Sequence, residues 1–188
     1  MIKSYAENSF QYLDKLFIIC NKFVLYLLLG ISIPLIIELP VILGWWLGTS
    51  TEHMILFSRL YVIFMVVLAL HNPITTIIHS TGKIKYYILW VDSITLLCLP
   101  ITFVLFHLGF PDYFAFLSMI STYSIAHIIR LICLKHYYQR FSYYTYIRTI
   151  ILPGAIVAVI TSLLAFLLHQ SFVSEIPQIL ALFILSPI

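Results

Sequence analysis

Charged side chains are scarce in this sequence. Only 9% of its 188 residues are Asp, Glu, Lys or Arg, whereas 62% are hydrophobic. A soluble domain averages about 25% charged and about 45–50% apolar residues, so this chain has too few polar groups to cover a surface in water. The scarcity favours a protein embedded in lipid. The net charge of +3 is too small and too scattered for nucleic-acid binding, and we expect no nucleic-acid partner.

Motifs for catalysis and metal binding are also missing. The sequence contains no D-x-D, G-x-S-x-G or H-E-x-x-H segment, and its three cysteines form no C-x-x-C pair that would suggest a zinc site. The segment S-T-G-K at 80–83 resembles the end of a phosphate-binding loop, but Ile77 and Ile84 occupy positions where that loop needs Gly and Ser or Thr. We therefore expect neither an enzyme nor a resident cofactor or metal.

Long apolar runs dominate what is present. A bilayer-spanning helix needs about 20 mostly apolar residues, and five runs reach that length, at 23–43, 55–78, 86–108, 113–134 and 149–168. A sixth run, at 178–188, is too short to span. Residues 1–22 place apolar side chains at helical spacing, which predicts a separate amphipathic segment at the membrane interface. The predicted fold is all-α: a polytopic transmembrane bundle at 23–188 with five full spans and a partial sixth.

Basic residues are distributed unevenly between the two sides of this predicted bundle. Eight of the ten Lys and Arg residues fall on one side: Lys3, Lys15, Lys22, Lys83, Lys85, Lys135, Arg140 and Arg148. The opposite connections, around residues 48, 111 and 174, contain none. Because basic loops stay in the cytoplasm, we expect a cytoplasmic N-terminus and a tight cytoplasmic turn at S-T-G-K. Trp45 and Trp46 follow the first span, at the level of an aromatic belt.

Four charged residues lie inside the predicted spans, where charge is costly and often functional. At about 1.5 Å per helical residue, Glu38 and Arg59 share a depth near the outer end, and Asp92 and Arg130 share one near the inner end. The depths predict two ion pairs between consecutive helices. Such pairs are either structural, with each arginine also able to reach a headgroup, or they line an aqueous cavity and contact an anionic substrate or a coupling ion.

The second predicted span contains further polar residues. His71, Thr75 and His79 recur every four residues and share one face, which indicates a polar stripe toward the bundle interior rather than a metal site. Asn72-Pro73 interrupts the hydrogen bonds of this helix, and Pro34 and Pro40 disturb the first span. Broken helices flank the translocation path in many transporters. The candidate substrate or ion-pathway residues are Glu38, Arg59, His71, Asn72, Asp92 and Arg130.

Several segments resemble a known family when they are read in order. These are K-S-Y-A-E-N-S-F-Q-Y-L-D-K-L-F, K-F-V-L-Y-L-L-L-G-I-S-I-P-L-I-I-E-L-P-V-I-L-G-W-W-L-G, S-T-G-K-I-K-Y-Y and L-P-I-T-F-V-L-F-H-L-G-F-P. Together they are similar to the later part of bacterial Wzx-type polysaccharide flippases, which export O-antigen and capsule repeat units within the MATE-like superfamily. The resemblance extends from Ile2 to about Arg148, and it rests on order and spacing more than on any single motif.

The resemblance implies a function as well as a fold. Such flippases have two bundles of six helices and move undecaprenyl-diphosphate-linked oligosaccharide across the bacterial cytoplasmic (inner) membrane during lipopolysaccharide or capsule synthesis. The chain would then be a fragment whose partner is the missing N-terminal half, and cavity arginines would balance the diphosphate. The alternatives are a MATE-type small-molecule or drug antiporter, a polysaccharide polymerase-like membrane enzyme and a structural membrane subunit.

Overall fold

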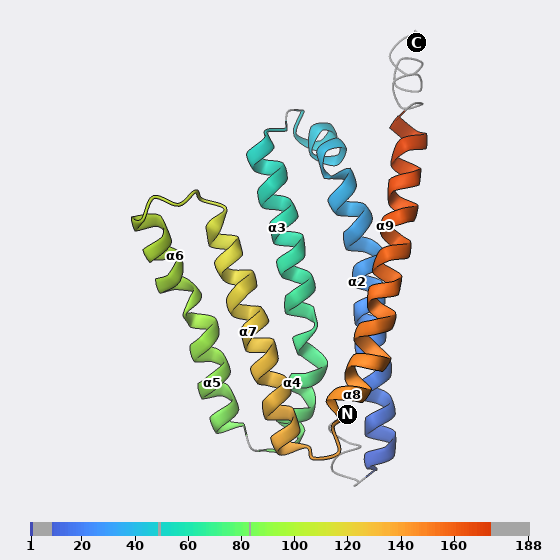
Figure 1. Ribbon diagram of the computed structural model, residues 1–188, viewed down its shortest axis with the longest axis vertical. Helices are drawn as coiled ribbons and strands as arrows, with labels where there is room; N and C mark the ends of the chain where they lie inside the picture. The colour runs from blue at the N-terminus through green and yellow to red at the C-terminus, as the bar shows by residue number, and fades with distance from the viewer. Residues whose placement is uncertain (2–8, 49, 83, 174–188) are drawn as a thin grey trace.

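The computed structural model describes residues 1, 9–48, 50–82 and 84–173, and helices are the only regular elements in these ranges (Figure 1). The helices are α2 (Phe10–Leu47), α3 (Glu52–Ala69), α4 (His71–Ser80), α5 (Lys85–Leu96), α6 (Cys98–His107), α7 (Phe114–Tyr137), α8 (Tyr143–Tyr146), the π-helical η1 (Ile147–Ile151) and α9 (Leu152–Val173). Five helical segments are long and apolar enough to cross a membrane, so the predicted all-α fold with five spans is confirmed. The partial sixth span lies outside the described residues.

Prolines explain where the spans are interrupted. A proline ring clashes with the carbonyl group four residues earlier and supplies no N–H. Accordingly, α3 ends at Ala69, four residues before Pro73, and α5 ends at Leu96, four residues before Pro100. The predicted break at Asn72-Pro73 is therefore confirmed. Pro153 does not end a helix, since the residue four positions before it lies inside the widened turn of η1.

The first helix, α2, is continuous despite Pro34 and Pro40. Its upper end turns out of the plane of the other helices (Figure 1), and we attribute the turn to Pro40, because sharp helix bends arise mainly at proline. At that end Trp45 and Trp46 are 87% and 77% exposed. With 38 residues, α2 is about 57 Å long at 1.5 Å per residue, roughly twice the ~30 Å hydrocarbon core of a bilayer.

The start of α2 corrects one expectation. The sequence predicted a separate interfacial helix before residue 23, but residues 10–22 form the first turns of α2. No Gly or Pro interrupts this stretch, and the Asn21 amide donates to the Phe17 carbonyl at 2.8 Å. Its apolar face contacts protein, because the Phe17 ring packs against the rings of Phe141 and Tyr146.

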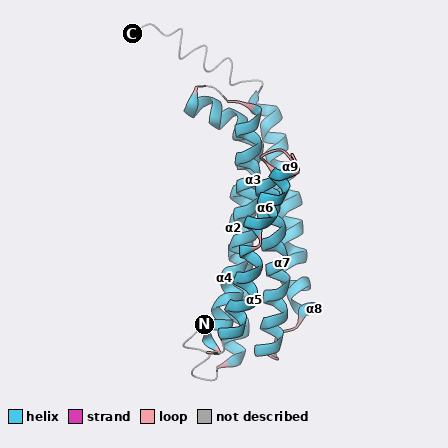
Figure 2. Ribbon diagram, turned by 90° about the vertical axis from the view of Figure 1, so that its left-hand side faces the viewer, coloured by secondary structure: helices cyan, strands magenta, loops and turns pink. Residues whose placement is uncertain are grey.

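The helices form a row that is one layer thick. In Figure 1 the order across the layer is α5–α6, α7, α3–α4, α2 and α9, and the view turned by 90° shows the layer edge-on as a narrow column (Figure 2). The contacts agree with this order, since α7 packs against α3, α4, α5 and α6, and α2 packs against α3 and α9. The fourth span therefore lies between the second and the third along most of the layer, although α4 and α5 also touch through Thr75, His79 and Tyr87.

The buried core lies in one half of the layer. It gathers around the end where α2, α5 and α8 begin and α4 and α7 terminate. The same end holds the described basic residues of the predicted cytoplasmic side: Lys15, Lys22, Lys85, Lys135, Arg140 and Arg148. Toward the other end burial is sparse, because α6 has no buried residue and α3 only Phe64. The basic end is thus the better-packed end of the protein.

Candidate functional site

Arg130 is the centre of a buried polar cluster between three helices. It projects from α7 and is only 9% exposed. Its Nη1 lies 2.7 Å from Nδ1 of His71 on α4, and its Nε donates to the hydroxyl of Tyr87 on α5 at 3.1 Å. That hydroxyl is also 2.8 Å from Oγ1 of Thr75. The guanidinium group therefore joins α4, α5 and α7.

The protonation of His71 follows from its partner. A guanidinium group can only donate hydrogen bonds, so Nδ1 of His71 accepts and the neutral ring carries its proton on Nε2. This ring stacks between Tyr123 and His127, with centroid distances of 5.9 and 5.3 Å. Nε2 is buried without a regular hydrogen bond, although the Tyr123 backbone makes a polar contact with the ring.

His127 extends the cluster toward α8. Its Nε2 lies 3.4 Å from the hydroxyl of Tyr146, whereas its buried Nδ1 has no hydrogen-bond partner within the described residues. Buried polar atoms are almost always paired in folded proteins. Two imidazole nitrogens are therefore incompletely satisfied beside one buried cation.

Local structure explains how the cluster assembles. Tyr123, His127 and Arg130 are spaced by four and three residues, which places them on one face of α7. His71 is the first residue of α4, immediately after the break that Pro73 causes, and it is buried there. The proline break and the polar face of α7 thus meet at the same level.

The electrostatic character of this cluster is positive and uncompensated. Among the described residues, the ion pairs are Arg140 with Asp14 and His169 with Glu38, and neither includes Arg130. Its partners, Tyr87 and neutral His71, carry no charge. Removing a charge from water without a counter-charge is costly, so an anion that reached the guanidinium group would be bound favourably.

The predicted ion pair between Asp92 and Arg130 is wrong. Asp92 is exposed on α5, and Arg130 instead contacts Tyr87 of the same helix. Asp92 lies five residues after Tyr87, and at about 3.6 residues per turn this places it well around the helix from the face that meets α7. The two charges do share a depth, but they do not share a face.

The predicted ion pair between Glu38 and Arg59 is also wrong. Pro40 supplies no N–H, so the carbonyl of Ile36, four residues earlier, lacks its helical donor. The Nε of Arg59 donates to this carbonyl at 3.1 Å. The Glu38 carboxylate is instead 2.9 Å from Nδ1 of His169 on α9. Arg59 therefore repairs the backbone that Pro40 disrupts.

The remaining candidates occupy separate places. Asn72 is exposed, and its carbonyl accepts from the Thr76 hydroxyl at 2.9 Å. His79 is exposed and its ring meets Tyr87 edge-on. No group of residues that could hold a metal ion occurs in the described part of the chain. Of the six candidates, the structure therefore brings only His71 and Arg130 together.

Sequence reasoning missed His127 and Tyr123 at this cluster and His169 as the partner of Glu38. The spacing along α7 was a usable signal for the first two, because residues four and three apart share a face. His169 is a polar residue near the outer end of the last span, at the depth of Glu38. The same depth argument, applied to non-consecutive helices, would have identified it.

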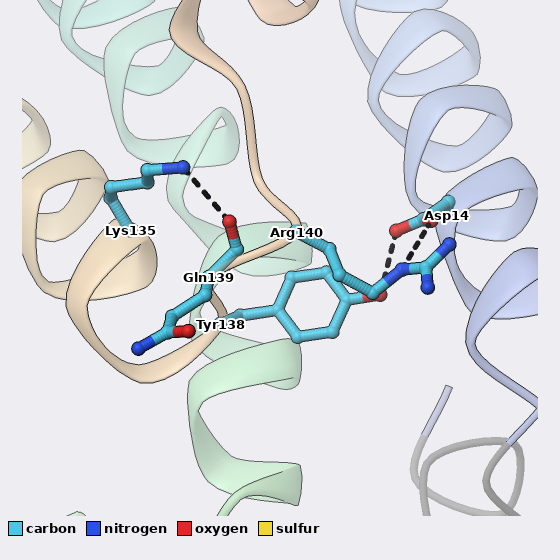
Figure 3. Close-up of polar contacts among 5 residues, drawn as sticks. All are labelled: Asp14, Lys135, Tyr138, Gln139 and Arg140. Carbon is cyan, nitrogen blue, oxygen red and sulfur yellow. Dashed lines mark hydrogen bonds and ion pairs between the residues drawn. The ribbon is translucent and has the colours of Figure 1, made fainter.

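A second polar cluster lies at the basic end (Figure 3). The Tyr138 hydroxyl donates to Oδ1 of Asp14 at 2.6 Å, and the Nε of Arg140 donates to Oδ2 at 3.3 Å. Lys135 donates to the carbonyls of Gln139 and Phe141, which fixes the turn after α7. Burial, together with the hydrogen bond to Asp14, raises the pKa of the Tyr138 hydroxyl. These contacts tie the start of α2 to the connection between α7 and α8.

Five apolar spans with buried polar clusters between them define a multi-pass helical membrane protein. No protein-family model, curated protein or solved structure matches this chain.

Proposed function

We propose that this protein is part of a transporter that flips undecaprenyl-diphosphate-linked oligosaccharide across the bacterial cytoplasmic membrane during cell-surface polysaccharide synthesis. The observation that carries the proposal is the buried guanidinium group of Arg130, which has no acidic partner among the described residues. The order and spacing of the segments that resemble Wzx-type flippases support it.

The depth of Arg130 suits a lipid-linked diphosphate. It lies seven residues before the end of α7 at Tyr137, which is about 10 Å along the helix axis. The basic residues at that end favour a cytoplasmic location, where the substrate is loaded. Arginine presents several donors in a fixed plane and so suits phosphate oxygens. In this proposal a second helical bundle, the missing N-terminal half, covers the open side of the layer.

Binding of undecaprenyl diphosphate to the purified chain in lipid nanodiscs tests the proposal. Arg130→Gln is expected to weaken binding by about tenfold or more, because hydrogen bonds to charged groups contribute about 1.5–3 kcal/mol. Arg130→Lys, which keeps the charge but loses the planar donors, is expected to be intermediate. Arg148→Gln is the matched control, since it removes one exposed positive charge at the same end.

The lipid series decides the outcome. Undecaprenyl monophosphate should bind more weakly than the diphosphate, and undecaprenol should not compete. If undecaprenol binds as tightly as the diphosphate, or if Arg148→Gln weakens binding as much as Arg130→Gln, a specific role for Arg130 is refuted. Circular dichroism of each variant confirms that the helices remain folded.

The orientation can be tested independently. After Cys20, Cys98 and Cys133 are replaced by serine, single cysteines are placed in turn at exposed positions at both ends of the layer. In intact cells, cysteines at Lys15 and Arg140 are expected to resist an impermeant thiol reagent, whereas those at Ser50 and Asp112 react. Labelling at Arg140 but not at Ser50 would reverse the orientation.

One observation favours a second candidate function, a small-molecule antiporter of the MATE type. Glu38 is an acidic residue inside a span whose partner is an imidazole rather than an arginine. A pair of that kind can exchange protons with the aqueous side. Under this alternative, Glu38→Gln abolishes proton-coupled export of organic cations by the complete transporter, and Arg130→Gln does not.

A further inference from the structure

A cavity of about 230 Å³ lies at the basic end, between the start of α2, the connection between α7 and α8, and η1. Its floor consists of buried side chains, including Phe17, Ile77 and Ile150. Its rim includes the exposed residues Arg140 and Thr145. Figure 3 shows Arg140 and Tyr138 reaching across toward Asp14 along one side of this region. The cavity thus has a buried interior and a polar entrance.

One part of the cavity is aromatic. The rings of Phe17, Phe141 and Tyr146 pack against one another with centroid distances of 5.8–6.3 Å, and all three are at most 6% exposed. Flat, rigid aromatic faces of this kind suit ligands with exposed C–H groups. The aromatic part alone does not distinguish a lipid tail from a ring.

The other part is rich in hydrogen-bonding groups. The Asp14 carboxylate, Arg140 and the hydroxyls of Ser142, Thr145 and Thr149 line it. Arg140 uses its Nε for Asp14 and also makes a polar contact with the Tyr138 hydroxyl, and its two terminal nitrogens form no further hydrogen bond within the described residues. The Thr145 hydroxyl is likewise without a partner there. Unused donors beside a buried aromatic wall indicate a ligand with several hydroxyl groups.

Charge narrows the choice of ligand. Asp14 and Arg140 form an ion pair, so the two charged residues of the cavity cancel. The Asp14 carboxylate would repel an anionic phosphate, and the Arg140 guanidinium group would repel a quaternary ammonium group. A neutral molecule avoids both repulsions and can form hydrogen bonds with both side chains.

We infer that this cavity binds a single neutral sugar ring, whose C–H face lies on the aromatic residues and whose hydroxyls bond to Asp14, Arg140 and Thr145. The volume is below the ~300–1,000 Å³ of pockets for drug-sized ligands, which suits one ring. Tyr146 lines the cavity, and its hydroxyl contacts His127 of the Arg130 cluster. The inference deepens and rests on the proposed function: the sugar nearest the diphosphate would occupy the cavity while Arg130 binds the diphosphate.

Saturation-transfer NMR on the complete chain in nanodiscs tests the inference with glucose, N-acetylglucosamine, inorganic phosphate and choline. We expect transfer to the ring protons of at least one of the two sugars. Thr145→Trp fills the cavity from its exposed rim and should abolish the signal. Tyr144→Trp places the same indole one residue away, outside the lining, and should keep it. Asp14→Asn should weaken binding about tenfold or more, the value of a hydrogen bond to a charged group.

Transfer to choline, or chemical-shift changes with phosphate, in the absence of a sugar signal would overturn the inference in favour of a headgroup site. A lack of signal with every probe, or a sugar signal that survives Thr145→Trp, would overturn it as well. Failure of the proposed function gives a different result. In that case the wild-type chain binds free sugar, and Thr145→Trp abolishes this binding. The binding of undecaprenyl diphosphate, however, is the same in the wild-type chain and in Arg130→Gln.

Discussion

Replacing Gly154 by alanine probes a close helix–helix approach in the layer, between α9 and α2. A Cβ atom at this position would overlap Cδ2 of Leu25 and lie 3.2 Å from its Cγ. Carbon atoms pack best at about 3.5–4.0 Å, so the Leu25 side chain must move. It is only 6% exposed and belongs to the core, which leaves it little room. The substitution is therefore expected to strain the α2–α9 interface.

The magnitude has two opposing parts. Overpacking a tight core costs about 1–3 kcal/mol, and replacing glycine inside a helix gains about 0.8–1.0 kcal/mol. The net expectation for Gly154→Ala is a destabilisation of about 0–2 kcal/mol. Gly30→Ala is the matched control, because Gly30 is also helical but its added Cβ meets no atom within 4 Å. Gly30→Ala should stabilise the protein by about 0.8–1.0 kcal/mol. The difference in free energy of unfolding between the two variants therefore isolates the cost of the clash with Leu25.

The free energy of unfolding can be measured by titrating SDS into mixed micelles and following the helical circular dichroism signal. A Leu25→Ala background supplies the second arm, since it removes the atoms that the new Cβ would meet. There, Gly154→Ala should stabilise rather than destabilise the protein. If Gly154→Ala stabilises the wild-type chain as much as Gly30→Ala does, the close approach of α9 to α2 is refuted.

Three further predictions concern polar contacts. Because Asp92 and Arg130 do not touch, the effects of Asp92→Asn and Arg130→Gln on the free energy of unfolding should add within about 0.5 kcal/mol. If the double variant is instead more stable than this sum, the two side chains do form an ion pair. Glu38 and His169 do touch, so their double-mutant cycle, measured in the same way, should give a coupling of at least about 0.5 kcal/mol. Folding raises the pKa of Tyr138, so its hydroxyl should contribute fully below its ordinary pKa of about 10 and lose that contribution as the pH rises through the raised value. The difference in melting temperature between wild type and Tyr138→Phe should be constant from about pH 7 to 10 and shrink above that; a difference that disappears below pH 10 would contradict the assignment.

Properties that depend on local chain chemistry could be predicted from the sequence. The five spans follow from run length alone, because a lipid-spanning helix needs about 20 apolar residues. The break near Leu70 follows from Pro73, since a proline acts on the carbonyl four residues earlier. The same rule, applied to Pro40, would also have indicated that Ile36 needs a donor such as Arg59.

Properties that depend on helix rotation and order could not be predicted in this way. Asp92 and Arg130 lie at a similar depth along the membrane normal, but depth alone does not determine whether two side chains face each other. The predicted neighbours do pack together, the first span on the second and the third on the fourth. The direction in which each side chain points also depends on the rotation of each helix about its axis, which the sequence does not give. The intervening position of α7 decides that Arg130 meets both His71 and Tyr87. Only contacts between segments distant in the chain determine that position.

The one-layer arrangement has a consequence for how this protein loses its structure. At one margin α5 and α6 pack chiefly on α7, and at the other α9 packs chiefly on α2. Each helix is thus held mainly by its neighbours in the row, and the free energy of unfolding approximates a sum over adjacent interfaces, as in repeat proteins. Opening then proceeds from the two margins inward. The backbone amides of α6 and α9 exchange with solvent first, and those of α4, α7 and the start of α5, around the Arg130 cluster, exchange last.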